Sequence, residues 1–257
     1  MRAIARSAAT ICQPQHDFPA DSITIENLEF MPRHRFYKYF DEKKWAEAFL
    51  DGNLLFRSLA YFRDYEDAEI RGDYHEGTML YRPTEGLVIN NKTQGKTFTL
   101  PGWTLESEVK GGEIFVYCLS RSLNDVMREK FRAAACVEIR DINTFCARIA
   151  KALPSHATFD GPPNRTRIGW RVKYFHETEG VNPRWALPGQ IAASKSYMYA
   201  WQDEFRLLFS ITDALAFEQV KLQLVQKSMR RPQDPTLHHG YHVHAESMRD
   251  ICLLHEF

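Results

Sequence analysis

The sequence predicts an α+β fold that contains more strand than helix. Short runs rich in aromatic and β-branched residues recur along most of the chain, and Gly, Asn or Pro separates one run from the next. Only three segments have the length and apolar spacing of helices. The chain has 257 residues, of which 44% are hydrophobic and 26% charged, a composition typical of globular proteins and sufficient for a sizeable core.

The N-terminal part predicts a strand, a helix and a second strand. Residues 1–28 are polar and without pattern, so we expect a loosely ordered arm, followed by a single domain over 29–257. His34–Phe40 alternates as a strand does, and Asp41 is suited to cap a helix that ends at Leu50. Asp51-Gly52-Asn53 terminates that helix, and a short strand over 54–58 follows.

An acidic segment comes next, with seven acidic residues and two arginines between Asp64 and Glu85. Such a run most often forms a solvated loop or helix face, and we predict that here. Beyond it, the pattern predicts strands over 87–89, 97–100, 113–119 and 135–139, and helices over 123–132 and 142–152.

The C-terminal third predicts mainly strands and loops. Pro and Gly mark 154–165 as a loop, and alternation over 167–176 favours a strand. Further expectations are two strands within 197–211, a strand or helix over 217–225, and a basic loop over 227–235.

Composition and charge exclude several classes of protein. The 33 basic residues balance the 33 acidic ones, so the chain is not a uniformly basic nucleic-acid binder. No run approaches the roughly 18–20 apolar residues of a membrane span, and the N-terminus lacks a signal-peptide core. Five scattered cysteines without a CxxC pair argue against a disulfide scaffold and a zinc ribbon. We therefore expect a cytoplasmic protein that does not contact membranes.

The strongest chemical motif is a Gln-x-Glu pair where a loop enters a strand, formed by Gln202 and Glu204. Strand alternation would place both side chains on one face. A carboxylate on a rigid strand can bind a ribose hydroxyl and stabilise positive charge on a sugar carbon whose base departs. The residue two positions earlier can orient the nucleophile. The simpler alternative is an ion pair between Glu204 and Arg206.

Two more motifs precede that pair in the chain. Tyr37-Lys38 lies in an aromatic strand that is followed by a helix, by Gly52–Ser58, and by Tyr61-Phe62-Arg63-Asp64. Val116–Ser120 is a strand that ends in a hydroxyl. The order of basic residue, serine strand and Gln-x-Glu resembles the ADP-ribosyltransferase superfamily, with its split-sheet architecture. Lys38 stands where many members have arginine, and Cys118 replaces a hydroxyl residue.

The resemblance implies an NAD-dependent ADP-ribosyltransferase with NAD as its substrate. Glu204 and Gln202 would be catalytic, and the NAD-binding residues would be Tyr37, Lys38, Arg57, Ser58, Phe62, Ser120 and Tyr199. Trp201, Arg167 and Arg171 would bind the acceptor, for which charge interleaved with rings suits single-stranded RNA. The same motifs also resemble a widespread bacterial domain family found near defence and toxin genes. A toxin or effector with an antitoxin partner is therefore expected by analogy, whether its acceptor is RNA, DNA or protein.

Two other classes of function remain open. A metal-independent ribonuclease toxin would use Lys38 and the histidines for acid–base chemistry. A non-catalytic binding module would use none of these residues as catalysts. The histidines between His238 and His244 lack the spacing of metal ligands, so we expect no metal site and interpret them as part of a loop and a strand.

Overall fold

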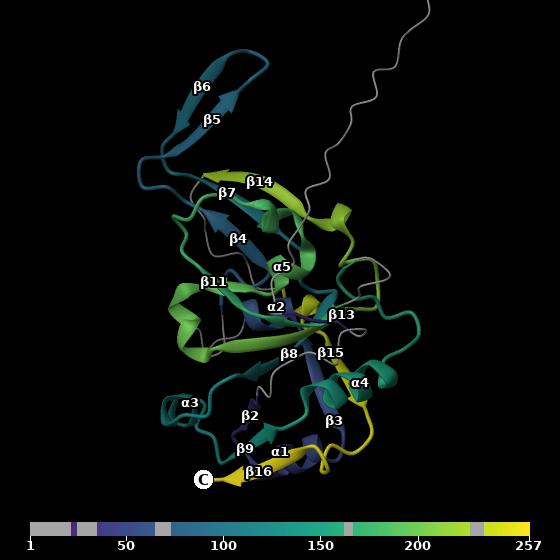
Figure 1. Cartoon of the computed structure of the whole chain (residues 1–257). Helices are drawn as coiled ribbons and strands as arrows, with labels where there is room; N and C mark the ends of the chain where they lie inside the picture. Colours follow the sequence, from purple (N-terminus) through teal and green to yellow (C-terminus); the bar gives the residue numbers. More distant parts are fainter. Residues whose placement is uncertain (1–21, 25–34, 65–72, 162–166, 227–233) are drawn as a thin grey trace, which may run out of the picture.

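A nine-stranded antiparallel sheet carries the fold (Figure 1). The computed structural model describes residues 22–24, 35–64, 73–161, 167–226 and 234–257. Helices and connections lie on both sides of this sheet, and smaller sheets add further strands, which confirms the predicted α+β class.

The sheet brings together strands from both ends of the chain. Its main path runs in the order β1 (Ser22–Thr24), β10 (Arg167–Arg171), β13 (Glu204–Ser210), β8 (Ile114–Ser120), β2 (Phe36–Phe40), β9 (Ala135–Ile139) and β16 (Cys252–Glu256). Two further strands, β3 (Asn53–Ser58) and β15 (Gly240–His244), pair with each other, and β3 also pairs with β8.

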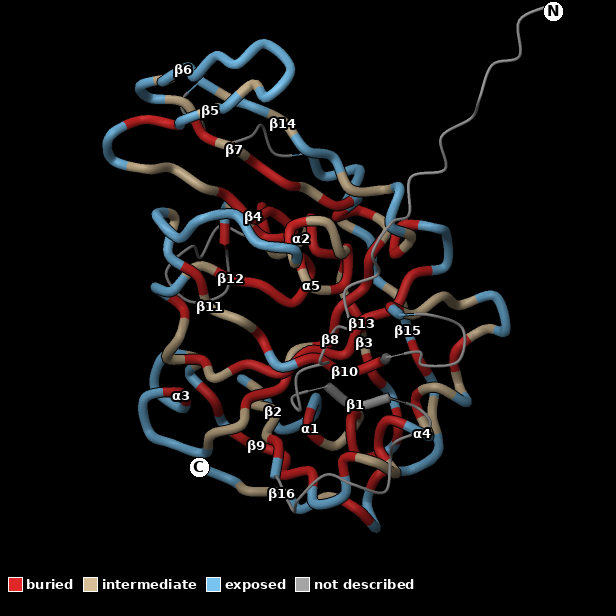
Figure 2. Tube along the Cα trace, turned by 45° about the horizontal axis from the view of Figure 1, so that its top comes forward, coloured by how far each residue is buried: buried red, intermediate tan, exposed pale blue. Residues whose placement is uncertain are grey.

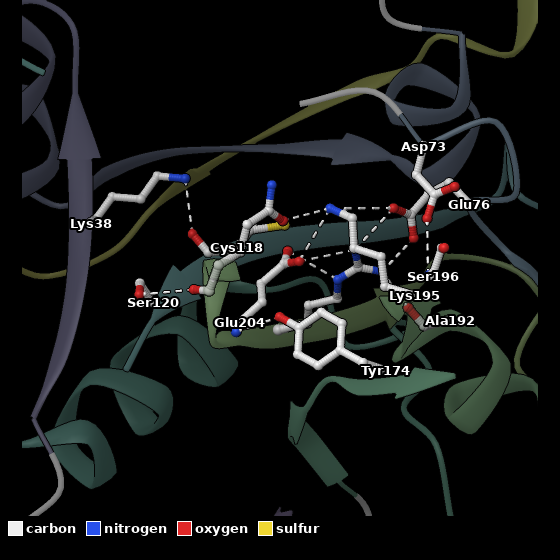
Figure 3. Close-up of polar contacts among 12 residues, drawn as sticks. Lys38, Asp73, Glu76, Cys118, Ser120, Tyr174, Ala192, Lys195, Ser196 and Glu204 are labelled. Carbon is white, nitrogen blue, oxygen red and sulfur yellow. Dashed lines mark hydrogen bonds and ion pairs between the residues drawn. The ribbon is translucent and has the colours of Figure 1, made fainter. Parts of the chain in front are cut away.

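The sheet divides along one edge of β8. At the end of β8, Ser120 pairs with Tyr37 of β2, whereas Val116 pairs with Arg57 of β3. Between these positions the ammonium of Lys38 donates a 2.9 Å hydrogen bond to the carbonyl of Cys118 (Figure 3). Lys38 thus satisfies a strand carbonyl where β8 changes partner, which a strand edge requires.

One face of the sheet packs against two amphipathic helices, α1 (Lys43–Leu50) and α4 (Ile142–Ala152). Phe205 and Phe36 meet there with ring centroids 4.7 Å apart, and Phe49 contacts Phe145 at 5.5 Å. Period-two alternation sends every second residue of β8 and β13 into this α1/α4 core.

The opposite face supports a second core beneath α5 (Pro188–Ala192), α2 (Leu59–Arg63), the 3₁₀ helix η1 (Pro183–Ala186) and β4 (Thr78–Tyr81). Leu208 and Val116, which alternate with residues of the α1/α4 core, point into it. Trp185 of η1 and Ile191 of α5 belong to the same core as Leu208 and Val116. This α5 core is the side of the sheet on which the charged residues described below lie.

The remaining elements are strands of smaller sheets and short helices. They are β7 (Trp103–Glu108) and β14 (Lys221–Gln226), which form a sheet with β4; the hairpin β5 (Leu87–Asn91) and β6 (Lys96–Leu100); the parallel pair β11 (Lys173–Phe175) and β12 (Ser194–Ser196); α3 (Asp125–Lys130); and the 3₁₀ helices η2 (Tyr197–Gln202), η3 (Phe217–Gln219) and η4 (Pro235–Leu237). The β5–β6 hairpin is largely exposed (Figure 2).

Several local predictions are wrong for identifiable physical reasons. The acidic segment is only partly solvated where it is described: Asp64, Asp73 and Glu76 are buried and 78–81 forms β4, whereas Glu85 is exposed; residues 65–72 lie outside the described residues. Glu42, not Asp41, caps α1, without a side-chain hydrogen bond. The segment 197–211 contains η2 and a single long strand, because Asp203 takes a left-handed conformation between them.

Other expectations are refined. The predicted strand over 167–176 is two strands, β10 and β11, that pair in different sheets. The 217–225 segment forms η3 and then β14. Part of the expected N-terminal arm, 22–24, is strand β1 on β10; the rest of it lies outside the described residues, as does 227–233 of the basic loop.

We expect Gly52→Ala to destabilise the fold by about 3 kcal/mol or more, and Gly95→Ala by only about 1–2 kcal/mol. Both glycines have a positive φ, +85° and +63°, so both variants experience the left-handed backbone penalty. A Cβ at Gly52 would also overlap the carbonyl oxygens of Ala245 and Glu246, whereas Gly95 has open space. Denaturant unfolding measures both values, and equal losses would contradict the role assigned to the close approach.

Candidate functional site

Four charged side chains form a buried cluster on the α5 side of the sheet (Figure 3). We call Glu76, Lys195, Glu204 and Arg206 the charge cluster. Their exposed fractions are 2%, 4%, 5% and 1%, and two carboxylates face two cations. Charges are tolerated at such depth only when they are paired and hydrogen-bonded, and here both conditions hold.

Arg206 is the centre of the charge cluster, because all five of its N–H donors have acceptors. Its Nε donates to Glu204 at 3.1 Å, and Nη2 donates to Glu204 at 3.3 Å and Glu76 at 2.9 Å. Its Nη1 donates to the other oxygen of Glu76 and, at 2.7 Å, to the carbonyl of Ala192 at the end of α5. The planar guanidinium can satisfy two carboxylates at once, which an ammonium cannot.

Lys195 supplies the second cation from β12. Its Nζ lies 2.8 Å from the side-chain oxygen of Gln202, 3.3 Å from Glu204 and 3.9 Å from Glu76. The same ammonium lies 4.9 Å from the ring centroid of Tyr199. Gln202 and Glu204 therefore meet at one ammonium, as their pairing in the sequence suggested. Strand alternation is not the reason, since Gln202 belongs to η2 and only Glu204 to β13.

The local structure explains how Glu204 reaches the charge cluster. Alternation along β13 sends Phe205 into the α1/α4 core and Glu204 and Arg206 to the opposite face. The left-handed turn at Asp203 separates η2 from the strand. The hydroxyl of Tyr174 accepts a 2.8 Å hydrogen bond from the backbone N–H of Glu204, which fixes the start of β13.

The electrostatics of the charge cluster keep Glu204 ionised. Burial alone would raise the pKa of Glu204, but the charges of Arg206 and Lys195 and the hydrogen bond from Arg206 lower it to about 2. For Glu76 burial is the larger influence and raises the pKa, although both cations oppose it. Burial tends to lower the pKa of Lys195, and the two carboxylates reverse this and raise it.

Three of the predicted site residues form one row across adjacent strands. Tyr37 of β2 pairs with Ser120 of β8, and Ser120 pairs with Glu204 of β13. Alternation places all three on the α5 side, because their neighbours Phe36, Leu119 and Phe205 belong to the α1/α4 core. Ser120 is buried, and its hydroxyl oxygen lies 3.0 Å from the carbonyl oxygen of Gln202 and 3.2 Å from that of Ser122, the two acceptors for its single O–H. We call these residues the Tyr37–Ser120–Glu204 row.

Lys38 does not belong to this row. It alternates with Tyr37 and therefore leaves β2 on the α1/α4 side, where its ammonium lies 4.5 Å from the centroid of Tyr117. Lys38 and Glu204 therefore leave the sheet on opposite faces and do not line one NAD site together, contrary to what the resemblance implied. A shift of one residue along a strand reverses the face of a side chain, and here it places a tyrosine in the row.

Arg57, Ser58 and Phe62 form a separate group around α2. Ser58 is fully buried, caps α2 by accepting from the N–H of Tyr61, and donates a 2.7 Å hydrogen bond to the carbonyl of Leu237. The guanidinium of Arg57 lies over the ring of Tyr61 at 4.6 Å. Phe62 is half-buried against the α5 core. Since β3 meets β8 at Val116, four residues before Ser120, this group lies well away from Glu204 along the sheet.

The predicted acceptor residues are also separated. Trp201 is half-buried beside Phe131, at 5.9 Å, with the ammonium of Lys130 4.9 Å from its centroid. Arg171 ends β10 and is exposed, whereas the side chain of Arg167 lies outside the described residues. Lys173 begins β11 in another sheet, so the single strand predicted over 167–176 does not carry Arg171 and Lys173 on one continuous face.

Sequence reasoning missed Glu76 and Lys195. Glu76 was one of seven acids in a segment interpreted as solvated, and Lys195 stood in no recognised motif. The Glu204–Arg206 ion pair, considered as an ordinary surface pair, is real but buried. A detectable signal was Gly77, with φ +73°, directly after Glu76 and before β4, because it marks a tight turn and not an extended solvated loop.

Comparison with protein-family models, with curated proteins and with solved structures gives no match to this chain. Among the residues that the structure describes, no helix is long and apolar enough to cross a membrane. The same residues contain no group of three His, Cys, Asp or Glu side chains arranged to hold a metal ion.

We expect Arg206→Met to cost about 3–5 kcal/mol of unfolding free energy, because it leaves two buried carboxylates with only Lys195 for compensation. Arg249→Met is the matched control. Arg249 also contacts two carboxylates, Glu47 at 2.8 Å and Asp51 at 2.9 Å, but half of its side chain is exposed, so its loss should cost under about 1 kcal/mol. Urea unfolding of both variants tests this, and comparable losses would contradict the importance of burial.

Acid titration provides a second test. The pKa of Glu204 is lower in the folded protein than its ordinary value of 4.5, so its ionisation stabilises the fold above about pH 4.5 and that contribution is lost as the pH falls toward about 2. Glu204→Gln cannot titrate at this position. The difference in melting temperature between wild type and the variant should therefore be constant near neutral pH and should decrease as the pH falls from about 4.5 to about 2. A constant difference throughout would contradict the low pKa.

Proposed function

We propose that the chain is an NAD-dependent ADP-ribosyltransferase in which Glu204 is the catalytic carboxylate. The observation that carries the proposal is the Tyr37–Ser120–Glu204 row, in which three separate motifs occupy adjacent strands and one face of the sheet. An ionised carboxylate on a rigid strand is the group required beside a sugar carbon that becomes positively charged.

The charge cluster supports this role by fixing the carboxylate. Arg206 and Lys195 keep Glu204 ionised at neutral pH and donate three hydrogen bonds that orient its carboxylate, while the backbone N–H of Glu204 donates to the hydroxyl of Tyr174. Preorganised charges of this kind need no rearrangement during the reaction. Gln202 is held by the same ammonium, and its role in the proposed reaction is to orient the acceptor.

In the proposed reaction the bond between the ribose carbon and nicotinamide breaks, and nicotinamide leaves with the bonding electron pair. Glu204 stabilises the positive charge that develops on the ribose. A nucleophilic atom of the acceptor then bonds to that carbon, and its proton passes to solvent. Tyr37 at the far end of the row and the half-buried Trp201 supply aromatic surfaces for the nicotinamide or for a base of the acceptor.

The proposal includes a macromolecular acceptor, with single-stranded RNA as the first to test, and a role as a toxin or effector that an antitoxin neutralises. The half-buried ring of Trp201, with Lys130 beside it, has the combination of ring and cation that suits an unpaired base and its phosphate. Labelled NAD incubated with cell extract, followed by separate nuclease and protease digestion, identifies the acceptor class by the treatment that releases the label.

We expect Glu204→Gln to reduce transfer of label from NAD by about 100-fold or more, because it removes the charge that stabilises the ribose cation. Glu76→Gln is the matched control. It removes one carboxylate from the same charge cluster and leaves the same excess of cations, but Glu76 lies outside the Tyr37–Ser120–Glu204 row. At a temperature at which both variants are folded, Glu76→Gln should retain most of the transfer activity.

Two outcomes would contradict the proposal. Undiminished transfer by Glu204→Gln would exclude Glu204 as the catalytic carboxylate, and equal losses in both variants would assign the effect to the integrity of the charge cluster. A non-catalytic module that binds NAD would raise its melting temperature with NAD but transfer no label, since a ligand of the folded state stabilises it without reaction.

A further inference from the structure

A histidine–aspartate pair lies beside α2, apart from the charge cluster. His238 follows η4, and its Nε2 lies 2.8 Å from the Oδ2 of Asp64 at the end of α2. The carboxylate of Asp64 is buried, with 3% of its side chain exposed, whereas a quarter of the His238 ring is accessible. A buried acid that holds a partly exposed imidazole has the arrangement of a positioned general base.

The contacts of Asp64 determine which nitrogen of His238 is basic. Oδ2 also accepts from the backbone N–H of Asp234 at 3.1 Å, and Oδ1 accepts from Arg63 at 3.2 Å. Burial would raise the pKa of Asp64, but the hydrogen bonds from His238 and Asp234 and the charge of Arg63 lower it. An ionised carboxylate only accepts hydrogen bonds, so Nε2 of His238 donates to Asp64, and in the neutral imidazole Nδ1 is the nitrogen that can take up a proton.

A cation and an aromatic ring lie next to this base. The ring of Tyr61 meets His238 edge-on with centroids 6.0 Å apart, and its face carries the guanidinium of Arg57 at 4.6 Å. Arg57 pairs with Gly240, where a Cβ would approach the Arg57 Nη1 to 3.1 Å. A side chain at 240 would therefore press on the guanidinium. The ring and the guanidinium thus come from one continuous β3–α2 segment, and the base comes from the connection between η4 and β15, the strand that pairs with β3.

The neighbouring serine is not available as a nucleophile. Ser58 is fully buried, donates to the carbonyl of Leu237 at 2.7 Å, and accepts from the N–H groups of Tyr61 and His239. It joins η4 to α2 and so holds His238 in position. Because the Ser58 hydroxyl already makes these hydrogen bonds, His238 must take a proton from a nucleophile that the substrate supplies. An RNA phosphodiester supplies a hydroxyl beside a phosphorus, and an anion that a guanidinium can bind.

We propose that His238, positioned by Asp64, is the general base of a second active site that cleaves RNA, with Arg57 binding the scissile phosphate. Nδ1 of His238 takes the proton of the ribose 2′-hydroxyl while its oxygen bonds to phosphorus. The bond from phosphorus to the 5′-oxygen breaks, and that oxygen takes a proton from water. The products are a 2′,3′-cyclic phosphate and a 5′-hydroxyl end. Arg57 neutralises charge on the non-bridging phosphate oxygens. The ribonuclease considered from the sequence thus has a specific proposed site, which uses His238 and does not use Lys38.

The test uses the full-length chain without NAD and two oligonucleotides, one of DNA with a single internal ribonucleotide and one entirely of DNA. We expect wild type to cut only the first, at the ribonucleotide, and to leave a cyclic phosphate. His238→Gln should lower the rate by about 100-fold or more, and Asp64→Asn should also lower it, because the carboxylate that sets the imidazole tautomer is lost. Arg57→Lys should lower it about tenfold, since lysine keeps the charge but not the fork.

His242→Gln is the control, because His242 is an exposed histidine on the adjoining strand β15 and should leave the rate unchanged. The assay contains no NAD, so cleavage does not depend on transferase activity, and failure of this proposal is distinguishable from failure of the transferase proposal. Melting temperatures show which variants are folded. Absence of cleavage by wild type, equal cleavage of both oligonucleotides, or full activity in folded His238→Gln would each overturn the proposal.

Discussion

The buried guanidinium of Arg206 constrains the whole α5 side of the molecule. A guanidinium removed from water must satisfy five N–H donors, and this one does so with Glu76, Glu204 and the end of α5. These partners are 130, 2 and 14 residues away in the chain. The requirement therefore fixes the turn before β4, the end of α5 and the start of β13 relative to one another.

The sheet separates packing from chemistry through its alternation. Along β8 and β13 the side chains of one face build the α1/α4 core, and those of the other face include Ser120, Glu204 and Arg206. The rigid apolar face holds these strands in register, so the polar side chains opposite keep fixed positions. The same alternation places Tyr37 in the Tyr37–Ser120–Glu204 row. It sends Lys38 to the other face, from which its ammonium donates to the carbonyl of Cys118 where β8 changes partner.

Local sequence patterns predicted the strands and helices well where alternation or helical spacing was strong, as in Phe36–Phe40, Ile142–Ala152 and Ala135–Ile139. They also identified Gln202 and Glu204 as neighbours. They did not predict Glu76 or Lys195, because the burial of a charged residue depends on partners that a local pattern does not contain. Tyr174 was missed for the same reason, since its hydroxyl meets β13 only through the tertiary fold.

The acidic segment shows most clearly how distant partners change the meaning of a local pattern. Asp64 and Glu76 lie on either side of the residues that are not described, and each is buried with cations or donors from the C-terminal half of the chain. Asp64 holds a histidine, and Glu76 helps to hold the arginine that orients Glu204. A run of acidic residues that would be a solvated loop in isolation therefore supplies one anchor to each of the two candidate sites, because the connection before β15 brings donors to Asp64 and β13 brings Arg206 to Glu76.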